Sequence, residues 1–144
     1  MQLLTISRWV AAVPALATAV TAYGNFSHTC QDIELVKTDV RATCLDETAA
    51  ILYTNELDLN LCVGLDQTTA QLKWELLGKF SLYCVNCALA WIPAPLLTCS
   101  CAPLAGGNAN NATLNLDDGV GNSNGTLTCR TGQGFPVSKP KRST

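Results

Sequence analysis

The chain repeats itself. Phe26-Ser27, followed by Cys30, recurs as Phe80-Ser81, followed by Cys84, and "ELDLNLCVG" recurs downstream as "TLNLDDGVG". Each copy then closes on an apolar–polar alternation, "AQLKW" in the first and "GTLTC" in the second. A copy of roughly fifty residues is too small to bury much apolar surface alone. The tandem duplication therefore predicts that the two copies share a core.

The first residues predict a secretory signal peptide. Arg8 is the only early charge, a short apolar run follows from Trp9 to Val20, and small residues precede a cut after Ala22. A membrane anchor is the alternative, but the uncharged run is shorter than the ~18 residues that a membrane span prefers. We expect a signal peptide over residues 1–22, a secreted protein and no membrane span.

All eight cysteines follow the predicted cut. An even number of cysteines in a small exported chain favours disulfides. The spacing of Cys84 and Cys87 with Cys99 and Cys101 is also compatible with zinc. Behind a signal peptide, oxidation is the favoured interpretation, and we expect neither a metal nor a cofactor.

Three triplets have the pattern of N-glycosylation acceptors, which is consistent with export. They begin at Asn25, Asn111 and Asn124.

Charge is uneven along the chain. Residues 23–129 hold four basic residues against all eleven acidic ones. An acidic body argues against nucleic acid as a partner. Residues 130–144 are basic and rich in Gly and Pro, which predicts a disordered tail.

Short alternating runs predict strands. Apolar and polar residues alternate on either side of Thr38-Asp39, as in a hairpin. Pro93 and Pro95 predict a loop in the second copy. "GNSNG", which ends at Gly125, is typical of a tight turn. We therefore expect a mostly β protein.

The ordered motifs resemble the cyanovirin-N homology family. They read "FSHTC", "VRATC", "ELDLN" and "QLKW", then "FSLYC", "LTCSC", "LNLDDGVGN" and "NGTLTC". The resemblance covers Phe26 to Cys129 and implies two pseudo-symmetric lobes. Each lobe is a three-stranded sheet from one repeat, covered by a hairpin exchanged from the other. The repeats are residues 24–75 and 78–129, within a domain of residues 23–129.

The resemblance implies one disulfide in each repeat, Cys30–Cys44 and Cys84–Cys101. A nested Cys87–Cys99 bridge fits the second hairpin if a bulge corrects the facing. The exchanged hairpins would bring Cys62 to Cys129. The symmetric positions are Trp74 and Gly119, so a large residue opposite the smallest would replace the disulfide in the other lobe.

The resemblance also implies a sugar site between the start of the first repeat and the last hairpin. Sugar hydroxyls need convergent polar groups on rigid strands. The matching residues are Asn25, His28, Thr29, Asp46, Glu47, Asn122, Ser123 and Asn124. Two of them, Asn25 and Asn124, are also sequon asparagines, and a glycan on either would crowd the cleft.

The opposite pocket lacks the family's polar residues. Leu65 stands where the family has Asn, Leu82 and Tyr83 replace polar residues, and the first hairpin tip carries extra residues. We expect this end to bind no mannose.

An enzyme is the weaker interpretation. His28 is the only histidine, and Asp117-Asp118 falls at a turn, where capping is the ordinary role. No nucleophile–base pair or phosphate loop is visible. We expect a secreted lectin for mannose-type oligosaccharides or glycoprotein glycans. It should be a monomer that can form a domain-swapped dimer by extending residues 75–79. The alternative is a secreted cysteine-rich structural or effector-like protein that uses the same scaffold without binding sugar.

Overall fold

The computed structural model describes residues 24–130 and 132–133. The predicted signal peptide and most of the predicted tail lie outside these residues. Within the described part the chain forms eleven short strands and four single-turn 3₁₀ helices. Short strands that alternate buried and exposed residues account for the mostly β content that the sequence predicts.

The first repeat forms an antiparallel sheet in the order β1–β2–β3. The strands are β1 (Cys30–Val36), β2 (Asp39–Leu45) and β3 (Leu52–Asp58). In β2 every second residue is buried, beginning at Val40, and Cys44 pairs with Cys30 across the hairpin. A register shift between Gln31 and Glu34 marks a bulge in β1.

The second repeat builds the same sheet in the order β6–β7–β8. The strands are β6 (Cys84–Ala90), β7 (Leu96–Cys101) and β8 (Asn110–Asn115). A register shift again follows Val85, at the bulge that the nested disulfide requires. Pro93 lies in the loop between β6 and β7, as predicted.

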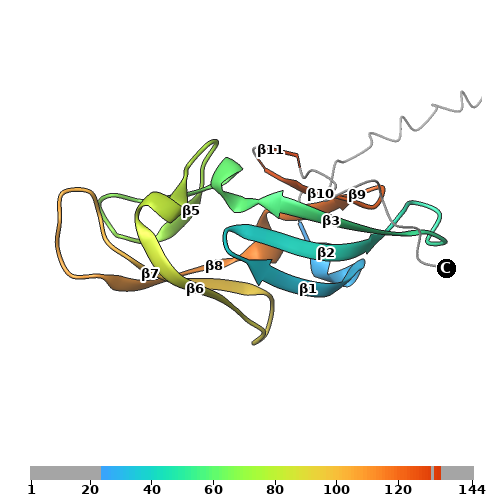
Figure 1. Ribbon diagram of the computed structural model, residues 1–144, viewed down its shortest axis with the longest axis horizontal. Coiled ribbons are helices and arrows are strands. Elements are labelled where there is room, and N and C mark those ends of the chain that lie inside the picture. The colour runs from blue at the N-terminus through green and yellow to red at the C-terminus, as the bar shows by residue number, and fades with distance from the viewer. Residues whose placement is uncertain (1–23, 131, 134–144) are drawn as a thin grey trace, which may run out of the picture.

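Two hairpins complete the lobes, and they are exchanged. Strands β4 (Val63–Leu65) and β5 (Leu72–Trp74) belong to the first repeat, and β5 contacts β8 of the second. Strands β9 (Val120–Ser123) and β10 (Thr126–Cys129) belong to the second repeat, and β10 contacts β3 and β2 of the first. Figure 1 shows the β1–β2–β3 and β6–β7–β8 sheets at opposite ends of the long axis, with β9 and β10 beside β3. Two pseudo-symmetric lobes with exchanged hairpins are confirmed.

A buried amide fastens the exchanged hairpin to the first lobe. Asn55 of β3 is 2% exposed, and its Oδ1 accepts a 2.6 Å hydrogen bond from the backbone N–H of Leu127. Its Nδ2 donates to the carbonyl of Gly125 at 2.8 Å and to that of Tyr53 at 3.1 Å. In the second lobe Ala112 stands at the matching position, opposite Cys99. The amide fastening therefore belongs to the first lobe only.

The 3₁₀ turns tie the repeats together. They are η1 (Phe26–His28), η2 (Leu59–Leu61), η3 (Phe80–Leu82) and η4 (Leu116–Asp118). Asp117 accepts hydrogen bonds from the backbone N–H and hydroxyl of Ser27, and Asn60 accepts one from the N–H of Ser81. Capping is the role that the sequence predicts for Asp117-Asp118, and Asp117 does accept the N–H of Ser27 in the first turn of η1. Their own turn, η4, is capped by Asn115, because the side chain of Asn115 precedes the turn and can reach the N–H of Asp117.

Both repeats contribute to one buried core. Phe26 and Phe80, the matched aromatic residues of the two F-S-x-x-C motifs, are almost fully buried, and Leu57, Leu97 and Leu127 join the same cluster. Burial of apolar area from both copies confirms the shared core that the short repeats predict.

All eight cysteines form disulfides. The pairs are Cys30–Cys44, Cys84–Cys101, Cys87–Cys99 and Cys62–Cys129. The four predicted pairings are confirmed, and the zinc alternative is excluded for Cys84, Cys87, Cys99 and Cys101 because each sulfur is bonded to another. Strand pairing extends past Cys129, since Gly132–Gln133 form β11 beside β10. The predicted tail therefore does not begin directly after Cys129.

Candidate functional site

The predicted site lies where three segments of the first lobe meet. These are η1 with Thr29 behind it, the loop between β2 and β3, and the tight turn between β9 and β10. Strand β9 contacts both η1 and η4. The hairpin of the second repeat is thus held at the start of the first repeat, as the resemblance implies.

Asn122 fastens the turn to its surroundings. Its Nδ2 donates to the carbonyl of Leu45 at 2.7 Å and to the hydroxyl of Thr29 at 3.0 Å. Its Oδ1 accepts from the N–H of Gly125 at 2.8 Å. Both amide protons are therefore used inside the protein, and Asn122 frames the site more than it offers groups to a ligand.

Asn124 joins the turn to the β2–β3 loop. Its backbone is left-handed, with φ of 50°, and its Oδ1 accepts a 3.1 Å hydrogen bond from the N–H of Glu47. The backbone of Glu47 is thereby held beside the turn, and its carboxylate is exposed. Gly125 follows with φ of 86°, and a Cβ at this position would overlap the ring of Tyr53.

Asp46 organises the loop that carries Glu47. Its Oδ1 accepts hydrogen bonds from the hydroxyl of Thr48 at 2.8 Å and from the N–H groups of Ala50 and Ile51 at 3.1 and 3.2 Å. Desolvation raises the pKa of Asp46, but these hydrogen bonds outweigh it and hold the pKa below its ordinary value. The carboxylate is therefore kept charged and the loop is kept in one shape.

Four predicted residues offer side chains without a partner. Among the residues that the structure describes, no hydrogen bond or ion pair is made by the side chains of Asn25, His28, Glu47 and Ser123, and all four are exposed. Asn25 precedes η1 in a left-handed conformation, and its N–H donates to the carbonyl of Asp117 at 2.7 Å. Hydrogen bonds link Thr29 to Asn122 and the loop of Asp46 and Glu47 to Asn124. Asn25 and His28 lie at the two ends of η1.

The opposite end repeats the framework but not the polar groups. Gln67 accepts a 2.8 Å hydrogen bond from the N–H of Leu104, as Asn124 accepts one from Glu47. Leu65, in the place of Asn122, is buried. Leu82 and Leu104 are 70% and 82% exposed. This end therefore presents apolar groups where the other presents His28 and Glu47.

Sequence reasoning missed the internal role of Asn122 and the clamp made by Asn55. The signal for Asn55 was available, since it is a polar residue at an inward position of an alternating strand.

No long apolar helix that could cross a membrane occurs in the described part of the chain. Nor do three His, Cys, Asp or Glu side chains gather there as metal ligands.

Residues 26–128 match the CVNH domain, so the chain belongs to the cyanovirin-N homology family, a family of carbohydrate-binding lectins rather than of enzymes. Solved structures of CVNH proteins have the same fold. The Gibberella zeae CVNH protein is 26% identical, with a TM-score of 0.64 over 74% of this chain and 97% of its own. The T. borchii protein is 24% identical, with a TM-score of 0.60 over 73% and 98%.

A MoCVNH3 variant in complex with (N-GlcNAc)4 is 18% identical to this chain, with a TM-score of 0.60. That structure covers 74% of this chain and 97% of its own. Comparison with curated protein sequences gives no significant match.

Proposed function

We propose that the protein is a secreted lectin for mannose-type oligosaccharides. Its family site lies at the first lobe, between η1, the β2–β3 loop and the β9–β10 turn. The observation that carries the proposal is the contrast within this site between a bonded frame and free polar groups. Asn122, Asn124 and Asp46 use their side chains to fix three segments, while His28, Glu47 and Ser123 remain free.

This division of roles suits sugar recognition. A neutral sugar presents hydroxyl groups that both donate and accept, and affinity depends on partners whose positions are set before binding. The carboxylate of Glu47 accepts, the hydroxyl of Ser123 does both, and the imidazole of His28 offers one donor and one acceptor when neutral. Because the frame is already bonded, only the side chains that contact the sugar are left to be ordered when it binds.

The opposite lobe end supports a single family site. Leu65, Leu82 and Leu104 occupy the places that hold Asn122, His28 and Glu47 in the first lobe. Leucine side chains cannot replace hydrogen bonds to sugar hydroxyls, and a buried hydroxyl without a partner is costly. We therefore propose that this end does not bind mannose.

The sugar itself is tested with two kinds of probe. A protein of the same fold was solved with (N-GlcNAc)4, and its 18% identity carries the fold alone to this chain. A glycan array that contains oligomannose and GlcNAc oligomers should be probed with mature protein produced without N-glycans. We expect oligomannose to be retained. Retention of GlcNAc oligomers alone would reject the mannose specificity but keep the lectin.

The competing function is a cysteine-rich scaffold that binds no sugar. The observation that favours it is the position of the sequons, since Asn25 and Asn124 flank the site and a glycan on either would cover it. Four disulfides would stabilise such a scaffold whatever its partner. If the array retains no glycan even for protein without N-glycans, the scaffold function replaces the lectin.

A further inference from the structure

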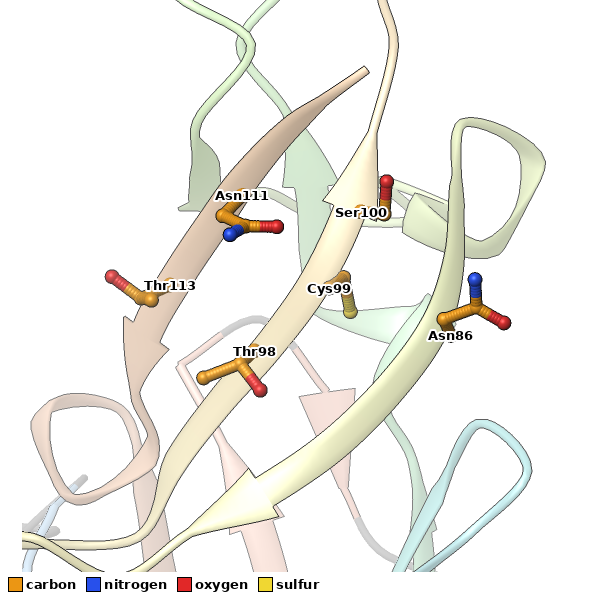
Figure 2. Close-up of a pocket in the computed structure, with 6 residues that line it drawn as sticks. All are labelled: Asn86, Thr98, Cys99, Ser100, Asn111 and Thr113. Atoms are coloured by element: carbon orange, nitrogen blue, oxygen red, sulfur yellow. The ribbon is translucent and has the colours of Figure 1, made fainter.

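The second lobe carries a groove away from both family pockets. It lies on the β6–β7–β8 sheet and has a volume of about 410 Å³. Figure 2 shows its lining, with Asn111 and Thr113 on β8, Thr98 and Ser100 on β7, and Asn86 on β6. Cys99 completes the lining. This volume falls within the ~300–1,000 Å³ typical of small-molecule sites.

The groove is lined by uncharged polar side chains that are largely without partners. Within residues 24–130, Asn86, Ser100, Asn111 and Thr113 make no side-chain hydrogen bond. The hydroxyl of Thr98 donates to the carbonyl of Ala88 at 3.3 Å. Alternation places Thr98 and Ser100 on one face of β7, opposite Thr113 and Asn111 of β8. Two rows of donors and acceptors therefore stand side by side.

The matching face of the first lobe is closed by its own side chains. Arg41 pairs with Glu56 on β3 at the register position that Thr98 and Thr113 hold in the second lobe. The Nε of Arg41 donates to Glu56 at 2.6 Å, and its Nη1 lies 3.1 Å from an oxygen of Glu34.

The hydroxyls of Thr43 and Thr54, which match Ser100 and Asn111, bond to each other at 2.9 Å. On this face of the first lobe the polar side chains are therefore paired with one another. On the matching face of the second lobe they are uncharged and largely unpaired.

We propose that the β6–β7–β8 groove binds a neutral oligosaccharide. The lining holds no charge, so it offers nothing that favours an anionic or cationic ligand. Hydroxyl and amide groups that both donate and accept match the hydroxyls of a neutral sugar chain. The groove is separate from the site proposed above, and the inference does not depend on that site.

Asn111 makes the groove sensitive to glycosylation. It begins the sequon Asn111-Ala112-Thr113, and both Asn111 and Thr113 line the groove. A glycan on Asn111 would start inside the groove and exclude a free oligosaccharide. The experiment therefore uses the full mature chain without N-glycans, and a glycosylated sample serves as a second arm.

The test is an NMR titration of the isotope-labelled protein with (GlcNAc)4 and with α-linked mannotriose. We expect saturable shifts of the backbone signals of Thr98, Ser100, Asn111 and Thr113 with at least one probe. Asn111→Ala should weaken this binding about fivefold, the loss of one hydrogen bond. Thr54→Ala, the matched change on the first lobe, should leave it unchanged. In the glycosylated sample the groove should no longer respond.

A second variant tests the groove by filling it. Thr98→Arg with Thr113→Glu copies the ion pair of Arg41 and Glu56, which the equivalent sheet of the first lobe accommodates at the same register position. This variant should fold and lose the groove shifts.

A third titration uses trigalacturonate, a charged trisaccharide, as the control for a neutral ligand. Groove signals that do not move at saturating concentrations of both neutral probes would overturn the inference. Equally tight binding of trigalacturonate in the groove would overturn it as well. Shifts at Glu47 and Ser123 alone would keep the proposed function and reject the groove. Shifts in the groove alone would keep the groove and reject the proposed site at the first lobe.

Discussion

The indole of Trp74 lies against Gly119, and a Cβ at Gly119 would overlap its ring. The corresponding contact in the other lobe is the Cys62–Cys129 disulfide. Trp74 pairs with Val63, and Cys129 pairs with Val120, so the two contacts occupy equivalent places on the exchanged hairpins. Each joins one repeat to the other, by packing in one lobe and by a covalent bond in the other.

Gly119→Ala should therefore destabilise the protein by about 1–3 kcal/mol, because the added methyl group overpacks a fixed contact. Urea unfolding measures the free energy. In a Trp74→Leu background the same change should cost less, since the indole is gone. Strictly additive costs for the two changes would contradict the contact.

The Asn55 clamp predicts a large effect from a small change. Asn55→Ala leaves the N–H of Leu127 and the carbonyl of Gly125 without their partners, at about 1–3 kcal/mol for each group left unpaired. Chemical denaturation should show this loss. Thr54→Ala, at a half-buried position on the opposite face of the same strand, should cost less than about 1 kcal/mol. Equal effects of the two changes would refute the clamp.

The four disulfides predict a protein without free thiols, which mass spectrometry of the unreduced protein tests. Cys62–Cys129 closes a separation of 67 residues, whereas Cys87–Cys99 closes 12 inside another bridge. Replacing both cysteines by Ala should cost about 4 kcal/mol for the first pair and at most about 3 for the second. A larger cost for Cys87–Cys99 would contradict this order.

Acid should loosen the β2–β3 loop. The pKa of Asp46 is depressed in the folded protein. Its contribution to the stability of the loop is therefore complete above the ordinary value of 3.8 and is lost as pH falls through the lower folded value. Hydrogen exchange of the amides of Ala50 and Ile51, corrected for the intrinsic rate, should therefore show falling protection below about pH 4. Asp46→Asn should abolish this pH dependence. Protection that is unchanged down to pH 2 would reject it.

Asn122 should affect sugar binding indirectly, by holding the segments of the site in place. Asn122→Ala removes three internal hydrogen bonds, so we expect sugar affinity to fall by about 1–3 kcal/mol together with a loss of stability and shifted NMR signals at Leu45 and Thr29. Ser123→Ala should weaken binding with unchanged stability. A loss of affinity in Asn122→Ala with unshifted signals would show direct contact with the sugar instead.

Much of the fold was predictable because the duplicated motifs carry its strongest constraints. The two F-S-x-x-C motifs place Phe26 and Phe80 in one core, and the exchange of hairpins leads from the repeat to the Cys62–Cys129 pairing. The frame of the site was less predictable. Whether the amide of Asn122 faces a ligand or Leu45 depends on how a hairpin from one repeat meets a loop from the other, which no local pattern contains.

The groove was missed for a different reason. Thr98, Ser100, Asn111 and Thr113 look like an ordinary solvated face until the strand register is known. Only the register shows that they stand where Arg41, Thr43, Thr54 and Glu56 bond to one another in the first lobe.

The central claim is that one lobe end binds sugar and the other does not. Calorimetric titration of an oligomannose probe into the Thr98→Arg, Thr113→Glu protein tests it most directly, because filling the groove leaves only the two lobe ends. We predict one site, an affinity lowered by about 1–3 kcal/mol when Glu47 and Ser123 are both changed to Ala, and no change for Gln67→Ala. Two equal sites, or binding that survives the first change and is lost with Gln67→Ala, would contradict the account.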